Sequence, residues 1–233
     1  MKALIMAGGK GSRISRHIPD IPKSCLNVGN QPLIAHTIDV LRENGIKEIA
    51  VVSGYKRDYL SGIVLPLNVE VFDNPFYEIT NSIASMWFAR GFIKDDDFLF
   101  INGDVFFASD VLNSILVETN DPVLLYDTSR KDEGDYMFYV KNNRLLNHGK
   151  DLSPELITGE YVGLAKVTEK FLPEFSIRLE ELIQGGKYNL WWENVLYSFI
   201  DECEVFVKDI NGLFWGEVDY IEDYRRILNF LGI

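Results

Sequence analysis

Apolar runs and helix-spaced apolar positions alternate along the first half of the chain. Five short runs have the length and composition of buried strands: residues 4–6, 48–53, 69–72, 98–101 and 123–126. Three segments between them carry apolar residues three and four positions apart, which predicts helices: residues 33–44, 82–91 and 109–118. Strands that alternate with helix-length crossovers favour a parallel sheet with helices on both faces.

The pattern changes after residue 127. Further strands are expected at residues 136–140, 161–167, 205–207 and 214–218, and helices at 169–175, 178–184, 192–200 and 220–231. No Pro- or Ser-rich linker and no internal repeat divides the chain. We therefore expect one α/β domain over residues 1–233. Its Rossmann-like sheet is mixed, mostly parallel and flanked by helices, with a small lid region in the C-terminal half.

Composition narrows the class of protein. With 233 residues, 47% of them hydrophobic, the chain can bury a substantial core, and no apolar run approaches the length of a membrane span. The net charge of −12 disfavours nucleic acid and anionic membrane surfaces as partners. Cys25 and Cys203 lack the spacing of a metal site or a redox motif, so we expect reduced thiols and a cytoplasmic protein.

The first strand leads directly into a glycine loop, Gly8-Gly9-Lys10-Gly11-Ser12-Arg13. Glycines let the backbone approach phosphates and direct N–H groups toward them, and Arg13 and Lys23 can neutralise the remaining charge. A Walker A loop is excluded because Gly11 stands where Ser or Thr is required. A dinucleotide fingerprint is excluded because Ile14 replaces its third glycine. The alternative is a strand-to-helix turn that binds no ligand.

Ligands of open α/β sheets bind beyond the carboxyl ends of the strands. The loops after residues 6, 53, 72 and 101 should therefore share one rim, which carries the glycine loop, Gly54-Tyr55, Asp73-Asn74 and Gly103-Asp104. Asp104 directly follows a strand, and a carboxylate there suits Mg²⁺. Capping the next helix is the alternative role, although Ser109 is better placed as that N-cap.

With these features together, the chain resembles the nucleotidyltransferases that couple a nucleoside triphosphate to a phosphorylated small molecule and release pyrophosphate. The glycine loop with Pro22-Lys23, Asn102-Gly103-Asp104 and Glu217-Val218-Asp219 carry this resemblance over nearly the whole chain. Three segments are most similar to bacterial CTP:phosphocholine cytidylyltransferases: Asn81-Ser82, Trp191-Trp192-Glu193-Asn194 and 218–225. Ser24 departs from the family, which usually carries Pro or Ala there.

The resemblance implies that an acceptor phosphate or phosphonate oxygen attacks the α-phosphorus of CTP. It makes Lys23, Arg13, Asp104 and Asp219 the catalytic set: Lys23 contacts the α-phosphate and acceptor, and Arg13 the β- and γ-phosphates. Asp104 and Asp219 would bind Mg²⁺. Glu217, two residues before Asp219, is the alternative ligand, and capping the last helix is an alternative role for Asp219.

Contacts to the nucleotide are expected in the first half of the chain (1–127) and contacts to the acceptor in the second (128–233). The nucleotide-binding candidates are Ala7, Gly8, Gly9, Gly11, Ser12, Arg13, Gly54, Tyr55, Asn81, Ser82 and Gly103. Asn81 and Ser82 are equally good candidates for the N-cap of the helix that follows. The choice of CTP over another triphosphate rests on the resemblance alone.

The acceptor-binding candidates are Tyr136, Glu160, Tyr161, Trp192 and Glu193. Core packing is the alternative for each aromatic, and at most one of Trp191 and Trp192 should face the cleft, because neighbours on a helix point in different directions. The resemblance places Tyr136 where choline enzymes carry a Trp of the aromatic cage. A weaker cage with more acid suits a primary amine or another polar acceptor, such as aminoethylphosphonate or phosphoglutamine, as well as a phosphocholine-like one.

The function expected from these residues and this resemblance is Mg²⁺-dependent cytidylyl transfer that forms a CDP- or CMP-linked product for surface polysaccharide or lipid modification. A sugar-1-phosphate nucleotidyltransferase using UTP, GTP or dTTP is the first alternative. A non-catalytic nucleotide-binding regulatory domain is the second. CTP and the acceptor are the expected partners of a monomer or homodimer, and no role is assigned to His17, His36 or His148.

Overall fold

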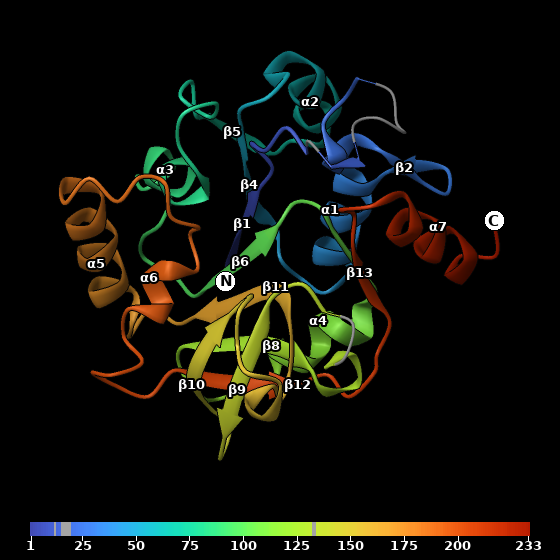
Figure 1. Ribbon diagram of the computed structural model, residues 1–233. Coiled ribbons are helices and arrows are strands. Elements are labelled where there is room, and N and C mark those ends of the chain that lie inside the picture. Colours follow the sequence, from blue (N-terminus) through green and yellow to red (C-terminus); the bar gives the residue numbers. More distant parts are fainter. Residues whose placement is uncertain (12, 15–19, 132–133) are drawn as a thin grey trace.

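A nine-stranded sheet runs through the computed structural model, which describes residues 1–11, 13, 14, 20–131 and 134–233 (Figure 1). Its strand order is β5-β4-β1-β6-β11-β8-β12-β10-β9. The strands are β1 (Lys2–Met6), β4 (Glu48–Ser53), β5 (Glu70–Asp73), β6 (Phe98–Asn102), β8 (Val123–Asp127), β9 (Met137–Lys141), β10 (Arg144–Gly149), β11 (Gly159–Val167) and β12 (Phe206–Asp209). Two short pairs stand apart from it: β2 (Asn27–Val28) with β3 (Gln31–Pro32), and β7 (Val105–Phe107) with β13 (Trp215–Glu217).

Parallel pairing builds the first half of this sheet. β1 pairs in parallel with both β4 and β6, so that Ile5 lies opposite Val51 on one side and Ile101 on the other. β11 then joins β6 and β8 in antiparallel fashion, and strands of the second half thereby extend the same sheet. The expected mixed sheet flanked by helices is confirmed, and its parallel pairs are β5–β4, β4–β1, β1–β6 and β8–β12.

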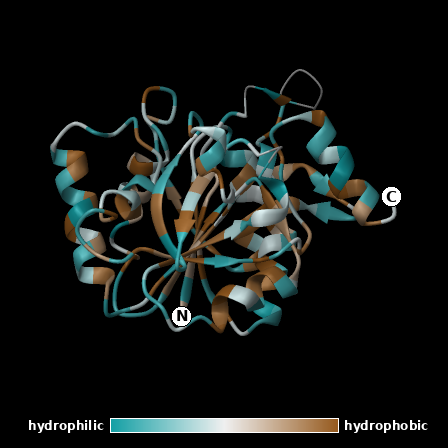
Figure 2. Cartoon of the chain, turned by 60° about the horizontal axis from the view of Figure 1, so that its bottom comes forward, coloured by the Kyte–Doolittle hydropathy of each residue, from teal (hydrophilic) through white to brown (hydrophobic). Residues whose placement is uncertain are grey.

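Helices cover both faces of the sheet. They are α1 (Leu33–Glu43), α2 (Arg57–Val64), α3 (Ser82–Phe88), α4 (Ser109–Leu116), α5 (Leu172–Gln184), α6 (Asn194–Tyr197) and α7 (Ile221–Phe230). Side chains alternate across a strand, so Ile5 packs into a core with α1, α2 and α4, whereas Leu4 packs into a second core with α3, α5 and α6. Figure 2 shows the apolar residues along the central strands and the inward sides of the helices.

Several predicted boundaries change. The two helices expected at 169–175 and 178–184 form one helix, α5, and the helix expected at 192–200 shrinks to the single turn α6. Ser109 is the first residue of α4 and not its N-cap, which is Ala108; the Ser109 hydroxyl accepts a hydrogen bond from Asn44. None of the helices among the described residues combines the length and hydropathy needed to cross a bilayer.

Five of these elements were not predicted: α2 and the strands β2, β3, β7 and β10. β10 lacks an alternating apolar pattern because it lies near the sheet edge, where Leu145 is its one buried residue. It is joined to β9 by the two-residue turn Asn142-Asn143, where both residues have positive φ (54° and 59°). Such a turn is a hairpin signal that the apolar pattern alone does not contain.

Candidate active site

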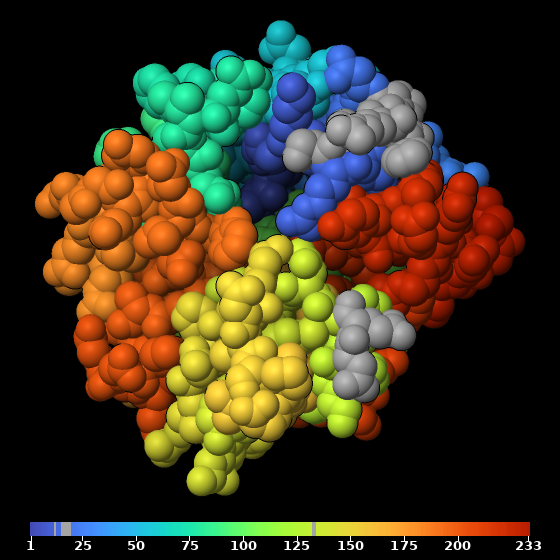
Figure 3. Space-filling model, viewed as in Figure 1, coloured from blue at the N-terminus to red at the C-terminus, as the bar shows by residue number. Residues whose placement is uncertain are grey.

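Three adjoining cavities form a cleft at the carboxyl ends of β1 and β6. Their volumes are about 230, 360 and 220 Å³, and Trp191 lines all three. The space-filling view shows a hollow at the middle of the molecule, where the N-terminal segment lies below the surfaces of the surrounding elements (Figure 3). The cleft thus lies at the rim that the alternation of strands and helices predicts, and most of the candidate residues meet there.

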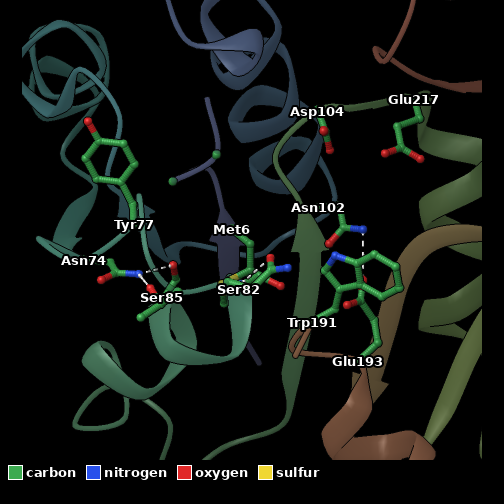
Figure 4. A pocket seen from close by; sticks show the side chains of 14 residues that line it. Met6, Asn74, Tyr77, Ser82, Ser85, Asn102, Asp104, Trp191, Glu193 and Glu217 are labelled. Atoms are coloured by element: carbon green, nitrogen blue, oxygen red, sulfur yellow. Dashed lines mark hydrogen bonds between the residues drawn. The ribbon is translucent and has the colours of Figure 1, made fainter. Parts of the chain in front are cut away.

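The first cavity is polar and almost free of cations. Its walls come from the glycine loop, α3 and the turn before it, and the end of β6: Met6, Gly8, Gly9, Asn74, Tyr77, Thr80, Asn81, Ser82, Ser85, Asn102, Asp104, Trp191, Glu193 and Glu217. The fully buried Asn74 donates to the hydroxyls of Thr80 (3.1 Å) and Ser85 (3.0 Å), as Figure 4 shows for Ser85. Neutral donors and acceptors held in this way suit the base and ribose of a nucleotide.

Asn81 and Ser82 line this cavity and also organise α3. Asn81 is the N-cap residue, and its side chain accepts a hydrogen bond from the Ser82 N–H. The Ser82 hydroxyl accepts a hydrogen bond from the Trp192 N–H at 2.9 Å. The two roles foreseen for this pair are therefore compatible in space, because capping leaves both residues at the cavity wall.

The second cavity is lined by the glycine loop and its cations. Ala7, Gly9, Gly11, Arg13, Lys23, Gly103, Asp104 and Asp219 all belong to its wall. Gly11 has a φ of +65°, and a Cβ at this position would lie 2.4 Å from Lys23 Cγ. Only glycine both adopts this backbone conformation easily and leaves room for the Lys23 side chain to cross the loop. The loop thus positions an amine among carboxylates.

Three carboxylates meet opposite Lys23. Oxygens of Asp104, Glu217 and Asp219 lie within 4.8 Å of one another. The pairing of β7 with β13 brings them together, because the Val218 N–H donates to the Asp104 carbonyl at 2.8 Å. Figure 4 shows the Asp104 and Glu217 side chains on the same side of the cleft. Three acids on two adjoining turns form a donor set that a hard divalent cation prefers.

The charges of this cluster are strongly coupled. Lys23 Nζ lies 3.3 Å from Asp104 Oδ2 and also bonds Asp219, and these two carboxylates outweigh burial and raise the pKa of Lys23. Burial, together with Asp104 and Asp219, raises the pKa of Glu217 well above its ordinary value. Arg13 forms ion pairs with Asp219 and with Asp135, the latter at 3.1 Å. The three carboxylates suit Mg²⁺, and the two neighbouring cations, Lys23 and Arg13, suit a polyphosphate.

The third cavity combines aromatic rings with acids. Its lining includes Tyr136, Tyr161, Trp191 and Tyr197, and the carboxylates of Asp135, Glu160, Glu193, Glu217 and Asp219. Trp191 meets the Tyr136 ring edge-on, with centroids 5.3 Å apart and the planes at 88°. Negative charge beside aromatic faces suits a positively charged ligand group.

Two predicted contacts are corrected by the fold. Trp192 is fully buried among the core residues, its Nε1 donates to Asn102 Oδ1 at 2.7 Å, and the neighbouring Trp191 is the tryptophan at the cleft. Gly54 and Tyr55 lie behind the glycine loop and outside the lining of the three cavities. The Tyr55 N–H donates to the Gly8 carbonyl at 3.0 Å, so this pair supports the loop from behind.

The remaining candidate residue of the third cavity is already paired, and the other residues considered lie elsewhere. Glu160 lines the third cavity, but its carboxylate accepts hydrogen bonds from Arg130 Nε (2.6 Å) and the Asp135 N–H (2.8 Å). Ser12 and His17 lie outside the described residues. His36 stacks on Phe106 and has no place in the cleft, whereas His148 bonds the Tyr136 hydroxyl through Nδ1 at 2.7 Å.

Sequence reasoning missed one aromatic side chain at this site. Asn74, from a loop assigned to the rim, and Ser85, from the 81–85 segment expected to meet the base and ribose, form a hydrogen-bonded pair in the wall of the first cavity. Tyr197 lines the third cavity four residues after Glu193, and the Tyr197 N–H donates to the Glu193 carbonyl at 2.9 Å. That helical spacing was the available signal, because residues four apart share one face.

Comparisons with known proteins place the chain in a family. The sequence matches the MobA-like NTP transferase domain over residues 3–160. Choline-phosphate cytidylyltransferase of Streptococcus pneumoniae is 26% identical, over 99% of this chain and 98% of the relative. CTP:phosphoglutamine cytidylyltransferase of Campylobacter jejuni is also 26% identical, over 96% of this chain and 97% of the relative.

The fold has a counterpart among solved structures. The structure of CTP:phosphocholine cytidylyltransferase from S. pneumoniae matches with a TM-score of 0.80 at 20% identity, covering 99% of this chain and 98% of that one. This likeness shows that the mixed sheet flanked by helices is the nucleotidyltransferase fold. Together with the match over residues 3–160, it establishes that the chain belongs to the MobA-like NTP transferase domain family and is a nucleotidyltransferase.

Proposed function

We propose that this enzyme transfers CMP from CTP to a small phosphate- or phosphonate-bearing acceptor in a Mg²⁺-dependent reaction that releases pyrophosphate. The observation that carries the proposal is the cluster of Asp104, Glu217 and Asp219, which faces Lys23. The cluster lies between a cavity lined mainly by amide and hydroxyl groups and one lined by aromatic rings and acids. A nucleotide fits the first cavity and an acceptor the third. Their phosphorus groups then meet at the acids and cations between the two cavities.

The choice of CTP has two supports. The first cavity is small and is lined by amide and hydroxyl groups, such as Asn74 and Ser85, that can pair with the edge of a pyrimidine. The two relatives described above are cytidylyltransferases by name. The fold alone does not distinguish one nucleoside triphosphate from another, because nucleotidyltransferases of different base preference can share it.

Charge neutralisation is the main task of the site. The acceptor oxygen is already anionic and needs no general base, whereas its approach to a triphosphate is opposed by charge repulsion. Lys23 lies at the junction of the cavities and would bridge the α-phosphate and the acceptor, and Arg13 would hold the leaving pyrophosphate. Mg²⁺ held by Asp104 and Asp219, with Glu217 as a further ligand, supplies the remaining positive charge.

The reaction then needs alignment more than proton transfer. An acceptor oxygen forms the new bond to the α-phosphorus as the bond to pyrophosphate breaks on the opposite side. The carboxylates of Asp104 and Asp219 raise the pKa of Lys23, so the side chain carries a positive charge. Its fixed charge therefore stabilises negative charge in the transition state.

Pyrophosphate release tests the proposal directly. Purified protein, CTP and Mg²⁺ are combined with a panel of phosphorylated amines, aminoalkylphosphonates and amino-acid phosphates, and we expect turnover with at least one of them. Asp104→Asn should reduce kcat by at least about 100-fold, the order expected when a transition-state contact to charge is lost. Asp110→Asn, an exposed change in the first turn of α4, is the matched control for folding and purification.

Two results would contradict the proposal. Turnover confined to hexose 1-phosphates with UTP, GTP or dTTP would indicate a sugar-1-phosphate nucleotidyltransferase. Tight CTP binding without pyrophosphate release from any pair of substrates would indicate a nucleotide-sensing domain. Calorimetric titration with CTP, run alongside the activity assay, separates this second result from inactive protein.

We also propose a cytoplasmic enzyme whose product is used to modify a surface polysaccharide or lipid. Cys25 is buried and Cys203 exposed, and both are free thiols, which suits a reducing compartment. A CMP-activated phosphate or phosphonate is a donor for a second transferase, which would pass the acceptor group on and release CMP. Localisation by fractionation, and product transfer in cell extract, test the two parts of this statement.

A further inference from the structure

Two tyrosines that line the third cavity have buried hydroxyl groups for which the described residues offer no hydrogen-bond partner. Tyr161 and Tyr197 line this cavity, their side chains are 7% and 4% exposed, and neither hydroxyl forms a hydrogen bond with the described part of the chain. Burying a hydroxyl without a hydrogen bond is unfavourable, and most buried polar groups in proteins are paired. Two such groups on one cavity wall therefore indicate a ligand that supplies the missing bonds.

Ring packing holds both hydroxyls in place. The Tyr161 ring stacks on Phe138 at 5.3 Å. The Tyr197 ring stacks on His148 at 4.0 Å and lies nearly parallel to the Tyr136 ring at 5.9 Å. Because these rings are fixed, neither hydroxyl can turn to another partner. The hydroxyls form part of a preformed pocket.

The same pocket has an unneutralised acid. Glu193 is 6% exposed and accepts a hydrogen bond from Asn102 Nδ2 at 3.0 Å, and no cation of the described residues forms an ion pair with it. Three other acids of the cavity are already paired: Glu160 with Arg130, Asp135 with Arg13 and Lys150, and Asp219 with Arg13 and Lys23. The remaining acid, Glu217, belongs to the cluster with Asp104 and Asp219 that is proposed to bind the metal. A buried carboxylate without a counterion favours a ligand that brings a positive charge.

On the basis of the proposed function, we propose that this pocket binds a primary ammonium group at the far end of the acceptor. The Tyr161 and Tyr197 hydroxyls and the Glu193 carboxylate receive its N–H bonds. A primary ammonium has three donors, which match these three acceptors in number. The Tyr136 ring and the Trp191 indole beside it provide aromatic contacts to the adjoining methylene groups.

Hydrogen bonding makes this pocket selective. A trimethylammonium group carries the same charge but has no N–H donor, so it would leave the two hydroxyls buried and unpaired. A neutral amide has donors but gains little from the Glu193 carboxylate. Sites built to pair with a polar group reject analogues without that group by large factors. We therefore expect the order primary ammonium, then amide, then trimethylammonium.

A series of acceptors of equal length tests this order. The series is the phosphate ester of 2-aminoethanol, its mono-, di- and trimethylated forms, and the phosphate ester of 2-hydroxyacetamide, each assayed with saturating CTP and Mg²⁺. We expect kcat/KM to fall with each methyl group and by at least about 100-fold from the primary to the trimethylated ammonium. Equal or higher kcat/KM with the trimethylated or amide acceptor would overturn the inference.

Removing one hydroxyl at a time tests the residues. Tyr161→Phe and Tyr197→Phe keep the rings and should each raise KM for the primary ammonium by about tenfold, a shift of the order of one hydrogen bond. KM for the trimethylated acceptor should stay the same. The selectivity ratio, which is kcat/KM for the primary ammonium divided by kcat/KM for the trimethylated acceptor, should therefore fall. Tyr139→Phe, on β9 and outside the cavity lining, is the matched control. A selectivity ratio that is unchanged in both cavity variants would refute the assignment.

Equilibrium binding separates this inference from the proposed reaction. The same acceptors are titrated calorimetrically into enzyme saturated with Mg²⁺ and a CTP analogue that cannot be cleaved between the α- and β-phosphates. Preferential binding of the primary ammonium without any pyrophosphate release from CTP would refute cytidylyl transfer and support the pocket assignment. Pyrophosphate release from CTP without preferential binding of the primary ammonium would support cytidylyl transfer and refute the pocket assignment. If either tyrosine variant fails to fold, Glu193→Gln serves in its place and should weaken the ammonium more than the amide.

Discussion

At the scale of single residues, Gly11 and Lys23 depend on each other. The Lys23 side chain runs through the space that a side chain at position 11 would fill, with Cγ, Cε and Cδ 2.4, 2.6 and 2.8 Å from an ideal Cβ. Lys23 itself is 9% exposed and is directed at Asp104 and Asp219. The glycine loop therefore determines the path of the lysine, in addition to the contact with phosphates predicted for it.

Gly11→Ala should reduce kcat/KM by about 100-fold, the order of loss expected when a catalytic group is displaced by about 1 Å. The new methyl group requires both a shift of Lys23 and a positive φ at an alanine. Gly9→Ala is the matched comparison, since a Cβ there meets no atom within 4 Å, and we expect a loss of less than about tenfold. Similar losses in both variants, measured by pyrophosphate release, would contradict this account.

Glu193 contributes a pH dependence to stability. Burial, only partly offset by the hydrogen bond from Asn102, raises the pKa of Glu193 from 4.5 to about 7. In the unfolded chain the carboxyl ionises near its ordinary value. The folded state therefore holds a proton that the unfolded state has lost at intermediate pH, and folding is disfavoured as the pH rises from 4.5 toward 7.

Glu193→Gln should remove this pH dependence. Between pH 4.5 and 7, the free energy of unfolding of the unchanged protein should fall relative to the variant by on the order of 3 kcal/mol. Denaturant unfolding in EDTA, at several pH values for both proteins, measures the difference. Parallel curves for the two proteins would show that Glu193 titrates at its ordinary pKa in the folded state.

At the scale of elements, the β9–β10 hairpin supports two tyrosines of the proposed acceptor pocket from outside the cavity lining. Its turn pairs Lys141 with Arg144, leaving Asn142 and Asn143 in the left-handed region. Along β10, His148 then reaches Tyr136 and Tyr197, through a 2.7 Å hydrogen bond and ring stacking. The turn and the shift in register between Leu145 and Asn147 together decide which β10 side chain supports the pocket.

Substitutions at Asn143 should separate backbone strain from side-chain loss. Asn143→Ala should lower the free energy of unfolding by about 1 kcal/mol, because alanine tolerates a positive φ poorly. Asn143→Gly should be neutral or slightly stabilising, since Asn-Gly suits this turn type. Thermal and denaturant unfolding provide the comparison, and equal destabilisation by both changes would indicate that the side chain matters, not the backbone.

At the scale of the whole molecule, the cleft joins segments from both ends of the chain. Arg13 and Lys23 come from the loop after β1, Asp104 from the turn between β6 and β7, and Asp219 from the residues after β13. In the ligand-free protein the two cations pair with Asp219. A metal and a triphosphate would connect the same segments, so their binding should stabilise the whole fold.

Mg²⁺ and CTP together should raise the unfolding free energy by about 2.7 kcal/mol when the ligand is at 100 times its Kd. CTP in EDTA should do much less, because the triphosphate then meets the carboxylates without an intervening cation. Asp219→Asn removes a predicted metal ligand, so this variant should lose most of the Mg²⁺-dependent increase in the free energy of unfolding. Thermal unfolding with each ligand alone and with both makes the comparison, and equal stabilisation by CTP in EDTA would refute the metal assignment.

The apolar pattern identified most of the strands of the sheet and the helices that cover it. Burial of one or two faces of an element requires apolar residues at regular intervals in the sequence. It failed where other forces decide the structure, as at β10 near the sheet edge and at the Asn142-Asn143 turn. The motifs named Lys23, Asp104 and Asp219, and the fold brings these residues together. They assigned Trp192 to the acceptor site, which was wrong, because Trp192 packs in the core against Phe100 and Trp191 lines the cleft.

The sequence by itself determined the α/β class, the glycine loop with its cations and the acids that face them. Each of these follows from local periodicity or from motifs whose residues lie a few positions apart. Only the tertiary structure decided that Glu217 joins Asp104 and Asp219, that Gly54 and Tyr55 support the loop from behind, and that Tyr161 and Tyr197 share one pocket with Glu193. These relations depend on strand pairing and packing between distant segments, where small differences in burial select one neighbour over another.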